Sequence, residues 1–233
     1  ALSKGLAMLE KMQAAVGGAE NLAAIRDIEQ VRTVEIETGG TTMKASQKTQ
    51  MILPTHLRQE QDFAFGKVIV FSDSQTGWML APQGERPIQP GVLRQVKSEL
   101  FRALPTLLLR SRVPGRAVNA IDDKTIEITD RDGNMAKLVM DPLTGRPARL
   151  VYVSTQMNGA ASEVAEVYSD WRDIAGVRLP YRLMIEQAGR KIFDATVTEC
   201  KVNSGLSAEE LGKKPAAPAA GAAKPAEDAT KKQ

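Results

Sequence analysis

The sequence predicts a mainly β protein with a few helices (α+β): a curved antiparallel sheet of about eleven or twelve strands, with a partly open concave side covered by helices. Runs of alternating polar and apolar residues fill most of the chain, and glycine-containing turns typical of β-hairpins separate them. A few stretches have apolar residues at helical spacing instead. Several expected strands mix polar and apolar residues on both faces, which favours a partly open sheet over a dry sandwich.

The N-terminal segment has a helical pattern. Apolar residues recur every three to four positions from Leu6 to Val16, and Gly17-Gly18 then ends the helix. A short second helical segment is expected over residues 19–25. The period then changes to two, which predicts strands. These strands are expected around Val34 and Ile36 and at residues 42–53, 56–63, 67–72, 78–80, 117–121, 125–129, 135–140, 148–154, 162–168, 179–187 and 192–202.

A hydrophobic helix is expected over residues 92–109, after a loop rich in proline and glycine at residues 82–90. Pro105 should kink or break this helix, because proline lacks an amide donor and its ring clashes with the preceding turn. The apolar residues on one face of this helix are Val92, Val96, Leu100, Leu104 and Leu107, with Leu93, Phe101 and Leu108 alongside.

The net charge of +3 belongs to the C-terminal tail. From Gly212 onward there are five lysines against Glu227 and Asp228, so the rest of the chain is neutral and shows no clustered basic surface for nucleic acid. Lysine, proline, alanine and glycine dominate the tail, which cannot bury enough apolar surface to fold. We therefore expect one domain over residues 1–211 and a disordered tail over residues 212–233.

The sequence offers few residues suited to catalysis or metal binding. His56 is the only histidine and Cys200 the only cysteine, so a His-Glu-x-x-His pair and a Cys/His metal cluster are both impossible. A serine triad would have to use the same histidine, and the chain contains no Gly-x-Ser-x-Gly motif. Asp130 to Asn134 is interpreted as a hairpin turn rather than a calcium loop, because the closing glutamate is missing. We expect no catalytic residue, metal or other cofactor.

Apolar, flexible side chains are the remaining candidates for a binding site. Methionine thioethers repack easily, so several methionines beside the hydrophobic helix could line a pocket that tolerates varied acyl chains. The same residues would also serve as ordinary core, and the sequence leaves both readings open. The candidate cleft and lid residues are Met43, Met135 and Met140 from strands, and Val96, Leu100, Phe101, Leu104 and Leu107 from the helix.

A hairpin around Trp171 resembles one family. Ser169-Asp170 precede this tryptophan, and Arg172-Asp173-Ile174, Gly176-Val177 and Leu179-Pro180-Tyr181 follow it. The segment is similar to a hairpin of LolA-like proteins, the periplasmic lipoprotein-carrier superfamily, especially those that accompany pitrilysin-type zinc peptidases in soil bacteria. Residues 141–147 and 17–20 resemble two further motifs of that family. Trp171, Gly176 and Pro180 are thus its expected structural positions, and the resemblance covers most of residues 1–211.

The resemblance implies an incomplete antiparallel β-barrel of about eleven strands, with helices over its open mouth. It implies a non-catalytic protein of the periplasm or outer membrane that binds a lipid, a lipoprotein acyl chain or another apolar ligand, with residues 92–109 as the lid. Arg58, Arg149 and Arg182 are candidates for an arginine that contacts the lid, by strand position only. The first residue is Ala1, which fits an exported protein, a trimmed chain or an excised domain equally well.

An alternative reading is an accessory or interaction domain that positions a pitrilysin-type zinc peptidase or another envelope assembly, without ligand transport. The sequence shows no recognisable docking surface for a partner protein, and we expect a monomer. The identity of the ligand cannot be read from the sequence.

Overall fold

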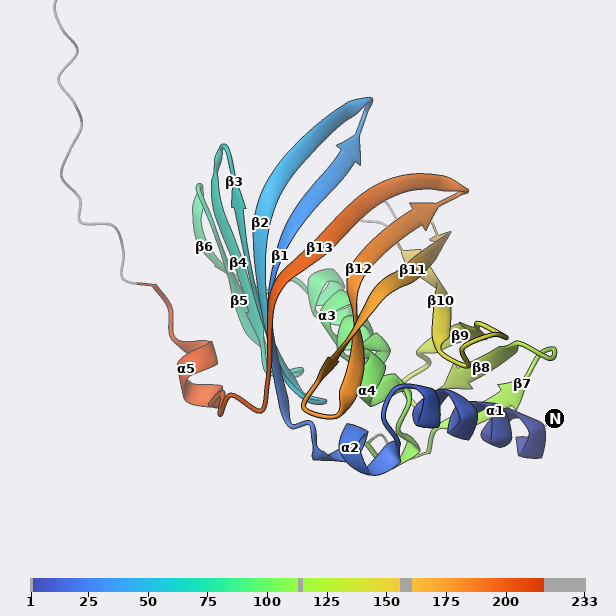
Figure 1. Ribbon diagram of the computed structural model, residues 1–233. Coiled ribbons are helices and arrows are strands. Elements are labelled where there is room, and N and C mark those ends of the chain that lie inside the picture. Colours follow the sequence, from blue (N-terminus) through green and yellow to red (C-terminus); the bar gives the residue numbers. More distant parts are fainter. Residues whose placement is uncertain (1, 113–114, 156–160, 216–233) are drawn as a thin grey trace, which may run out of the picture.

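A single antiparallel sheet of thirteen strands dominates the computed structural model, which describes residues 2–112, 115–155 and 161–215 (Figure 1). The strands are β1 (Asp27–Thr38), β2 (Thr41–Ile52), β3 (His56–Phe63), β4 (Gly66–Ser72), β5 (Gly77–Ala81), β6 (Gly84–Pro87), β7 (Ala117–Ala120), β8 (Thr125–Thr129), β9 (Met135–Met140), β10 (Pro147–Thr155), β11 (Ala161–Ile174), β12 (Val177–Gln187) and β13 (Arg190–Val202). The helices are α1 (Leu2–Ala15), α2 (Ala19–Ala24), α3 (Pro90–Arg102), α4 (Leu104–Leu107) and α5 (Ala208–Gly212), with a 3₁₀ turn at Arg110–Arg112.

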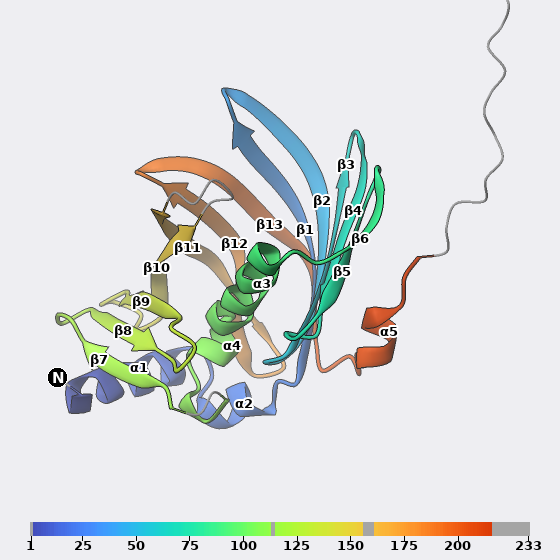
Figure 2. The same ribbon diagram turned by 180° about the vertical axis from the view of Figure 1, so that it is seen from behind.

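The sheet consists of two meanders joined in the middle. Its strand order is β6-β5-β4-β3-β2-β1-β13-β12-β11-β10-β9-β8-β7, so β1 pairs with β13 and every other neighbour is consecutive in the chain. The two edge strands, β6 and β7, do not pair with each other, and the sheet curves without closing. The segment that links them contains α3 and α4 and crosses the concave side (Figure 2).

Left-handed turns join the longest strands. Gly39 and Gly40 both have positive φ, as do Ala175 and Gly176, which matches the two-residue turn that suits twisted hairpins. The hairpin predicted around Trp171 is confirmed, but Pro180 lies inside β12 rather than at its start. Pro180 is tolerated there because β12 pairs with β13 only from Arg182 onward, which leaves the proline next to one partner strand.

The predicted strands are present, and the structure adds one. Residues 82–90 were expected as a loop, yet Gly84–Pro87 forms the edge strand β6, where Pro87 needs no second partner. The expected helix over residues 92–109 is two helices. Ala103 is extended between them, with φ −52° and ψ 121°, and Pro105 occupies the first turn of α4. The break expected at Pro105 therefore occurs just before it.

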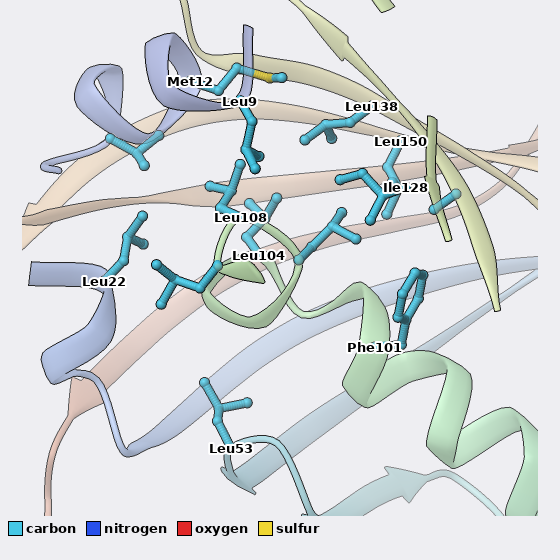
Figure 3. Packing of buried hydrophobic residues seen from close by; sticks show 14 of the residues in the cluster. Leu9, Met12, Leu22, Leu53, Phe101, Leu104, Leu108, Ile128, Leu138 and Leu150 are labelled. Atoms are coloured by element: carbon cyan, nitrogen blue, oxygen red, sulfur yellow. The ribbon is translucent and has the colours of Figure 1, made fainter. Parts of the chain in front are cut away.

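The apolar core fills one end of the concave side. Helix α1 packs on β7 and β8, and Gly5 allows this approach, since a Cβ there would lie 2.8 Å from the amide nitrogen of Ala120. Figure 3 shows side chains of α1, of α4 and of β8 to β10 meeting in one cluster. The labelled members from these elements include Leu9, Met12, Leu104, Leu108, Ile128, Leu138 and Leu150. Apolar side chains therefore fill this end of the concave face, and the remainder of that face lies on the other side of α4.

The C-terminal helix α5 contacts β3 and β4 on the face of the sheet opposite α3. Arg58 Nη1 donates hydrogen bonds to the carbonyl oxygens of Leu211 and Lys213, at 2.8 and 2.7 Å, and its guanidinium lies 5.4 Å from the centre of the Trp78 ring. Trp78 Nε1 donates to the Gly212 carbonyl at 3.2 Å. The folded unit therefore extends past the expected boundary at residue 211, and residues 216–233 of the expected tail lie outside the described residues.

Replacing Leu150 by alanine should destabilise the protein by about 2 to 5 kcal/mol, because this side chain is 0% exposed on the core face of β10. Val153 lies on the other face of the same strand and is 56% exposed, so Val153→Ala should change stability by less than ~0.5 kcal/mol. Urea unfolding of both variants measures the difference. Equal losses would mean that the concave side of β10 is not the packed side.

Candidate functional site

A cleft of about 300 Å³ lies between the concave face of the sheet and the junction of α3 and α4. One part of its wall is apolar and the other is polar or charged. The apolar side chains are Ile28, Met51, Ala103, Leu104, Pro105, Leu179, Pro180, Leu183, Ile185, Phe193, Ala195 and Val197. The polar and charged side chains are Gln30, Arg32, Gln47, Gln59, Glu99, Arg102, Tyr152, Glu166 and Tyr168.

A larger hollow, of about 760 Å³, lies on the opposite face of the sheet. Its wall contains exposed polar residues such as Thr33 and Ser46, together with ion pairs such as Arg182 with Asp194, at 2.9 Å. Such pairs on an open surface are already satisfied by each other and by water. The smaller cleft, which joins apolar walls to partly buried polar groups, is therefore the better candidate site.

Arg102 connects the helix to the sheet inside the cleft. Its guanidinium carbon lies 3.6 Å from the centre of the Tyr152 ring on β10, and its Nε lies 3.6 Å from Glu166 Oε1 on β11. The Tyr168 hydroxyl donates a hydrogen bond to Glu166 Oε2 at 2.9 Å, and Arg102 Nη1 donates to Ser98 Oγ at 2.5 Å. The Arg102 side chain is therefore fixed by a stacked ring, a carboxylate and a hydroxyl from three elements.

Arg32 on β1 has fewer partners. Its Nη2 donates to Gln30 Oε1, and Gln30 Nε2 in turn lies 3.6 Å from Cys200 Sγ. Arg32 Nε has no hydrogen-bond partner, and neither has Gln47 Oε1 on the neighbouring strand β2, although Gln47 is only 4% exposed. Among the residues that the structure describes, no carboxylate lies within 4.0 Å of the Arg32 guanidinium. The polar wall thus contains unused hydrogen-bonding capacity.

Burial changes the ionisation of this polar wall. It raises the pKa of Glu99 above the ordinary glutamate value, although the charges of Arg102 and Arg32 oppose this shift. Burial also lowers the pKa of Arg32 and raises the pKa values of Tyr152 and Tyr168. The tyrosines therefore stay neutral hydrogen-bonding groups, and the neutral form of Glu99 is favoured by its surroundings.

Most of the predicted cleft and lid residues do not line the cleft. Leu104, 8% exposed, is the predicted helix residue that does. The others on the helix and Met140 are buried in the core: Val96, Leu100, Phe101, Leu107 and Met140. The physical reason is the rotation of α3, which turns its apolar face into the core and presents Glu99 and Arg102 to the cleft.

The two remaining methionines lie elsewhere. Met135 is 45% exposed and is not part of the cleft wall, because it lies on the face of β9 opposite the core-facing residues Ala136 and Leu138. Met43 pairs with Ile36 near the tip of the β1–β2 hairpin and is partly exposed. It shares the sheet face of the cleft but is not part of its wall.

The family-motif residues form one contact between distant segments. A Cβ at Gly17 would lie 2.2 Å from the carbonyl oxygen of Gly176, and the Arg178 amide donates to the Val16 carbonyl at 2.8 Å. Trp171 pairs with Pro180 across the hairpin, and its ring meets Tyr168 edge-on at 6.2 Å. The two glycine motifs therefore dock the hairpin against the junction of α1 and α2.

The three strand arginines proposed as lid contacts face other partners. Arg58 binds the C-terminal segment, Arg149 pairs with Glu186 at 2.8 Å, and Arg182 pairs with Asp194. Sequence reasoning missed Arg32 and Arg102. A signal for Arg32 existed, because it falls on the same alternation as Ile28, Val34 and Ile36 and is thus a charge on a mainly apolar face.

Comparison with known proteins supports the fold. No family model and no curated protein matches the chain. A LolA superfamily protein from Nitrosomonas europaea superposes with a TM-score of 0.59 at 13% identity, over 90% of this chain and 97% of that one. The chain has a LolA-like fold. The predicted resemblance and the predicted incomplete barrel are confirmed at this level, with thirteen strands rather than eleven.

Two further solved structures share the LolA-like fold. A DUF1329 family protein from Desulfovibrio piger gives a TM-score of 0.55 at 13% identity, over 89% of this chain and 96% of that one. A domain from Vibrio parahaemolyticus, provisionally named as an outer membrane lipoprotein-sorting protein, gives 0.53 at 12% identity, over 91% and 97%. Identities this low speak for the fold alone.

The described ranges 2–112, 115–155 and 161–215 contain no group of three or more His, Cys, Asp or Glu side chains that could hold a metal ion. Their helices are all too short or too polar to cross a membrane.

Glu99→Gln should stabilise the protein more at neutral than at acidic pH. A raised folded-state pKa means that the stability from protonated Glu99 is full below the unfolded pKa and is lost as pH rises through the folded value. Urea unfolding at about pH 4 and about pH 8 should show a gain for the variant over the wild type only at the higher pH. Glu163→Gln, at an exposed position on β11, is the control. A pH-independent difference would contradict the prediction.

Proposed function

We propose that this protein is a non-catalytic, monomeric binding protein of the bacterial envelope, which holds a lipid, a lipoprotein acyl chain or another apolar ligand in the cleft beneath α3 and α4. The observation that carries the proposal is the cleft itself, with a continuous apolar wall from β12 and β13 under a helix cap. Support comes from the LolA-like fold and from the lipoprotein-sorting name of one structural neighbour. The envelope location rests on the same likeness.

The volume of the cleft limits the size of the ligand and therefore its affinity. A volume of about 300 Å³ is at the lower end of the usual range of ligand pockets, which suits one chain rather than several. Ten buried methylenes would contribute about 8 kcal/mol. Losses of ligand freedom oppose this gain, so affinities in the micromolar range are expected for a single chain.

The helices cap the cleft unequally in this proposal. Leu104 contacts the ligand, whereas Leu107 is fully buried in the core and holds α4 in place. Residues 92–102 would thus act as the cover and α4 as its anchor, with the extended residue Ala103 between them. The folded unit in this proposal ends after α5, and residues 216–233 serve as a spacer.

Ile185→Trp should weaken binding of a neutral apolar probe, because Ile185 lies on the cleft wall and the larger side chain would occupy ligand space. Titration with N-phenyl-1-naphthylamine should show a rise in Kd of about tenfold or more. Val153→Trp places the same side chain on an exposed position of β10 and should leave Kd unchanged.

Native mass spectrometry of the purified protein, followed by solvent extraction, tests whether an acyl species is bound. An apo mass together with no uptake of the probe by the wild type would overturn the ligand-binding proposal. The accessory-domain alternative would then be the better account of this LolA-like fold.

A further inference from the structure

The cleft contains a polar wall that an entirely apolar ligand would leave unused. Arg32 Nε and Gln47 Oε1 lack hydrogen-bond partners, and both residues line the cleft from neighbouring strands. Arg32 and Gln47 are directly opposite each other in the β1–β2 register, so their side chains lie side by side on the concave face. Burying polar groups without partners costs about 1 to 3 kcal/mol each. The Arg32 guanidinium can donate to a hydrogen-bond acceptor in the cleft, whereas Gln47 Oε1 can only accept a hydrogen bond.

The two arginines of the polar wall differ in their carboxylate partners. Arg102 has Glu166 as its carboxylate partner, and the Tyr168 hydroxyl holds the other oxygen of that carboxylate. Arg32 has no carboxylate partner among the described residues and donates only to the neutral Gln30 amide. Glu99 is the remaining acid of the cleft; burial raises its pKa, and its charge acts on Arg32 without an ion pair within 4.0 Å. Arg32 is therefore the guanidinium of this wall that has no carboxylate at ion-pair distance among the described residues.

We propose that the ligand is an amphiphile with a single acidic head group, a carboxylate or a phosphate monoester, which binds to Arg32 beside Gln47. This inference rests on the proposed function, since the head group needs a chain that occupies the apolar wall. Glu99 lies on the same wall of the cleft, and in its protonated form it would donate its hydroxyl to the same head group. An esterified acyl chain has no such acid, so free fatty acids or alkyl phosphates fit the wall better.

The apolar and the polar residues of the cleft lie at positions along the strands that suit an amphiphilic ligand. Phe193 pairs with Ile36 on β1, four residues beyond Arg32 and nearer the hairpin tips, and Ile185 pairs with Phe193. Four residues of an extended strand span about 13 Å. Apolar contacts thus begin beside the guanidinium, where Val197 pairs with Arg32, and continue to Phe193 over about the length of a medium chain.

Competition of four ligands with one chain length tests the inference. Decanoate, decyl phosphate, methyl decanoate and decylamine are titrated against protein loaded with the neutral probe N-phenyl-1-naphthylamine. We expect the two acids to displace the probe at about tenfold lower concentration than the methyl ester, and the amine to be weakest. The ratio of decanoate to decyl phosphate identifies which acid the site prefers.

Variants assign the preference to residues. Arg32→Met should remove the advantage of the acids while leaving methyl decanoate unchanged, and it should fold, because the same face of β1 already accommodates the apolar side chains Ile28 and Val34. Arg182→Met, on the opposite face, should keep the advantage.

The outcomes separate the two proposals. Equal displacement by acid and ester in the wild type would overturn the head-group inference and leave the binding function standing. An acid preference that survives Arg32→Met would also overturn it. Displacement by none of the four ligands, with no probe uptake, would remove the binding function itself.

Discussion

The pairing of β1 with β13 brings the first and last strands together in the middle of the sheet and sends β6 and β7 to its two edges. The chain between these edges has no short route, so it must cross the sheet. It does so on the concave side as α3 and α4, with an extended residue at Ala103 and Pro105 opening the second helix. The open barrel, its helical cap and the cleft beneath the cap are thus consequences of one strand order.

Rotation of the crossing segment then decides the chemistry of the cleft. Helix α3 has one apolar face, and the core formed with α1 and β8 to β10 takes it. The other side of the same helix carries Glu99 and Arg102, which consequently face the sheet across the cleft. Arg102 is held by Tyr152 and Glu166, so the helix is attached to β10 and β11 by polar contacts as well as by packing. A single amphipathic helix therefore supplies both the core and the polar wall.

Local patterns were sufficient for the elements but not for the cleft wall. Alternation and turn glycines located twelve of the strands, and Pro105 located the helix break. The edge strand β6 was missed because its proline and glycine are typical of loops. Met135 was assigned to the cleft because its type suited a pocket, whereas the face of a strand residue depends on its parity relative to the core, which Ala136 and Leu138 fix. Alternation puts Arg32 on the same face as Ile28 and Val34, but its position in the cleft wall beside Val197 depends on the β1–β13 register, which is a long-range pairing.

Stability alone does not explain Arg32, a half-buried charge that donates to Gln30 but has no carboxylate partner among the described residues. Replacing such a group with an apolar residue of similar size is often neutral or stabilising, so packing gives no reason for it. The surrounding strands could hold an apolar side chain at this position, since Ile28 and Val34 occupy equivalent positions on β1. On the same wall, Gln47 Oε1 also lacks a hydrogen-bond partner, and burial raises the pKa of Glu99. A guanidinium that has no carboxylate partner among the described residues and lines a cleft is more consistent with a binding site for an acidic ligand than with a packed core.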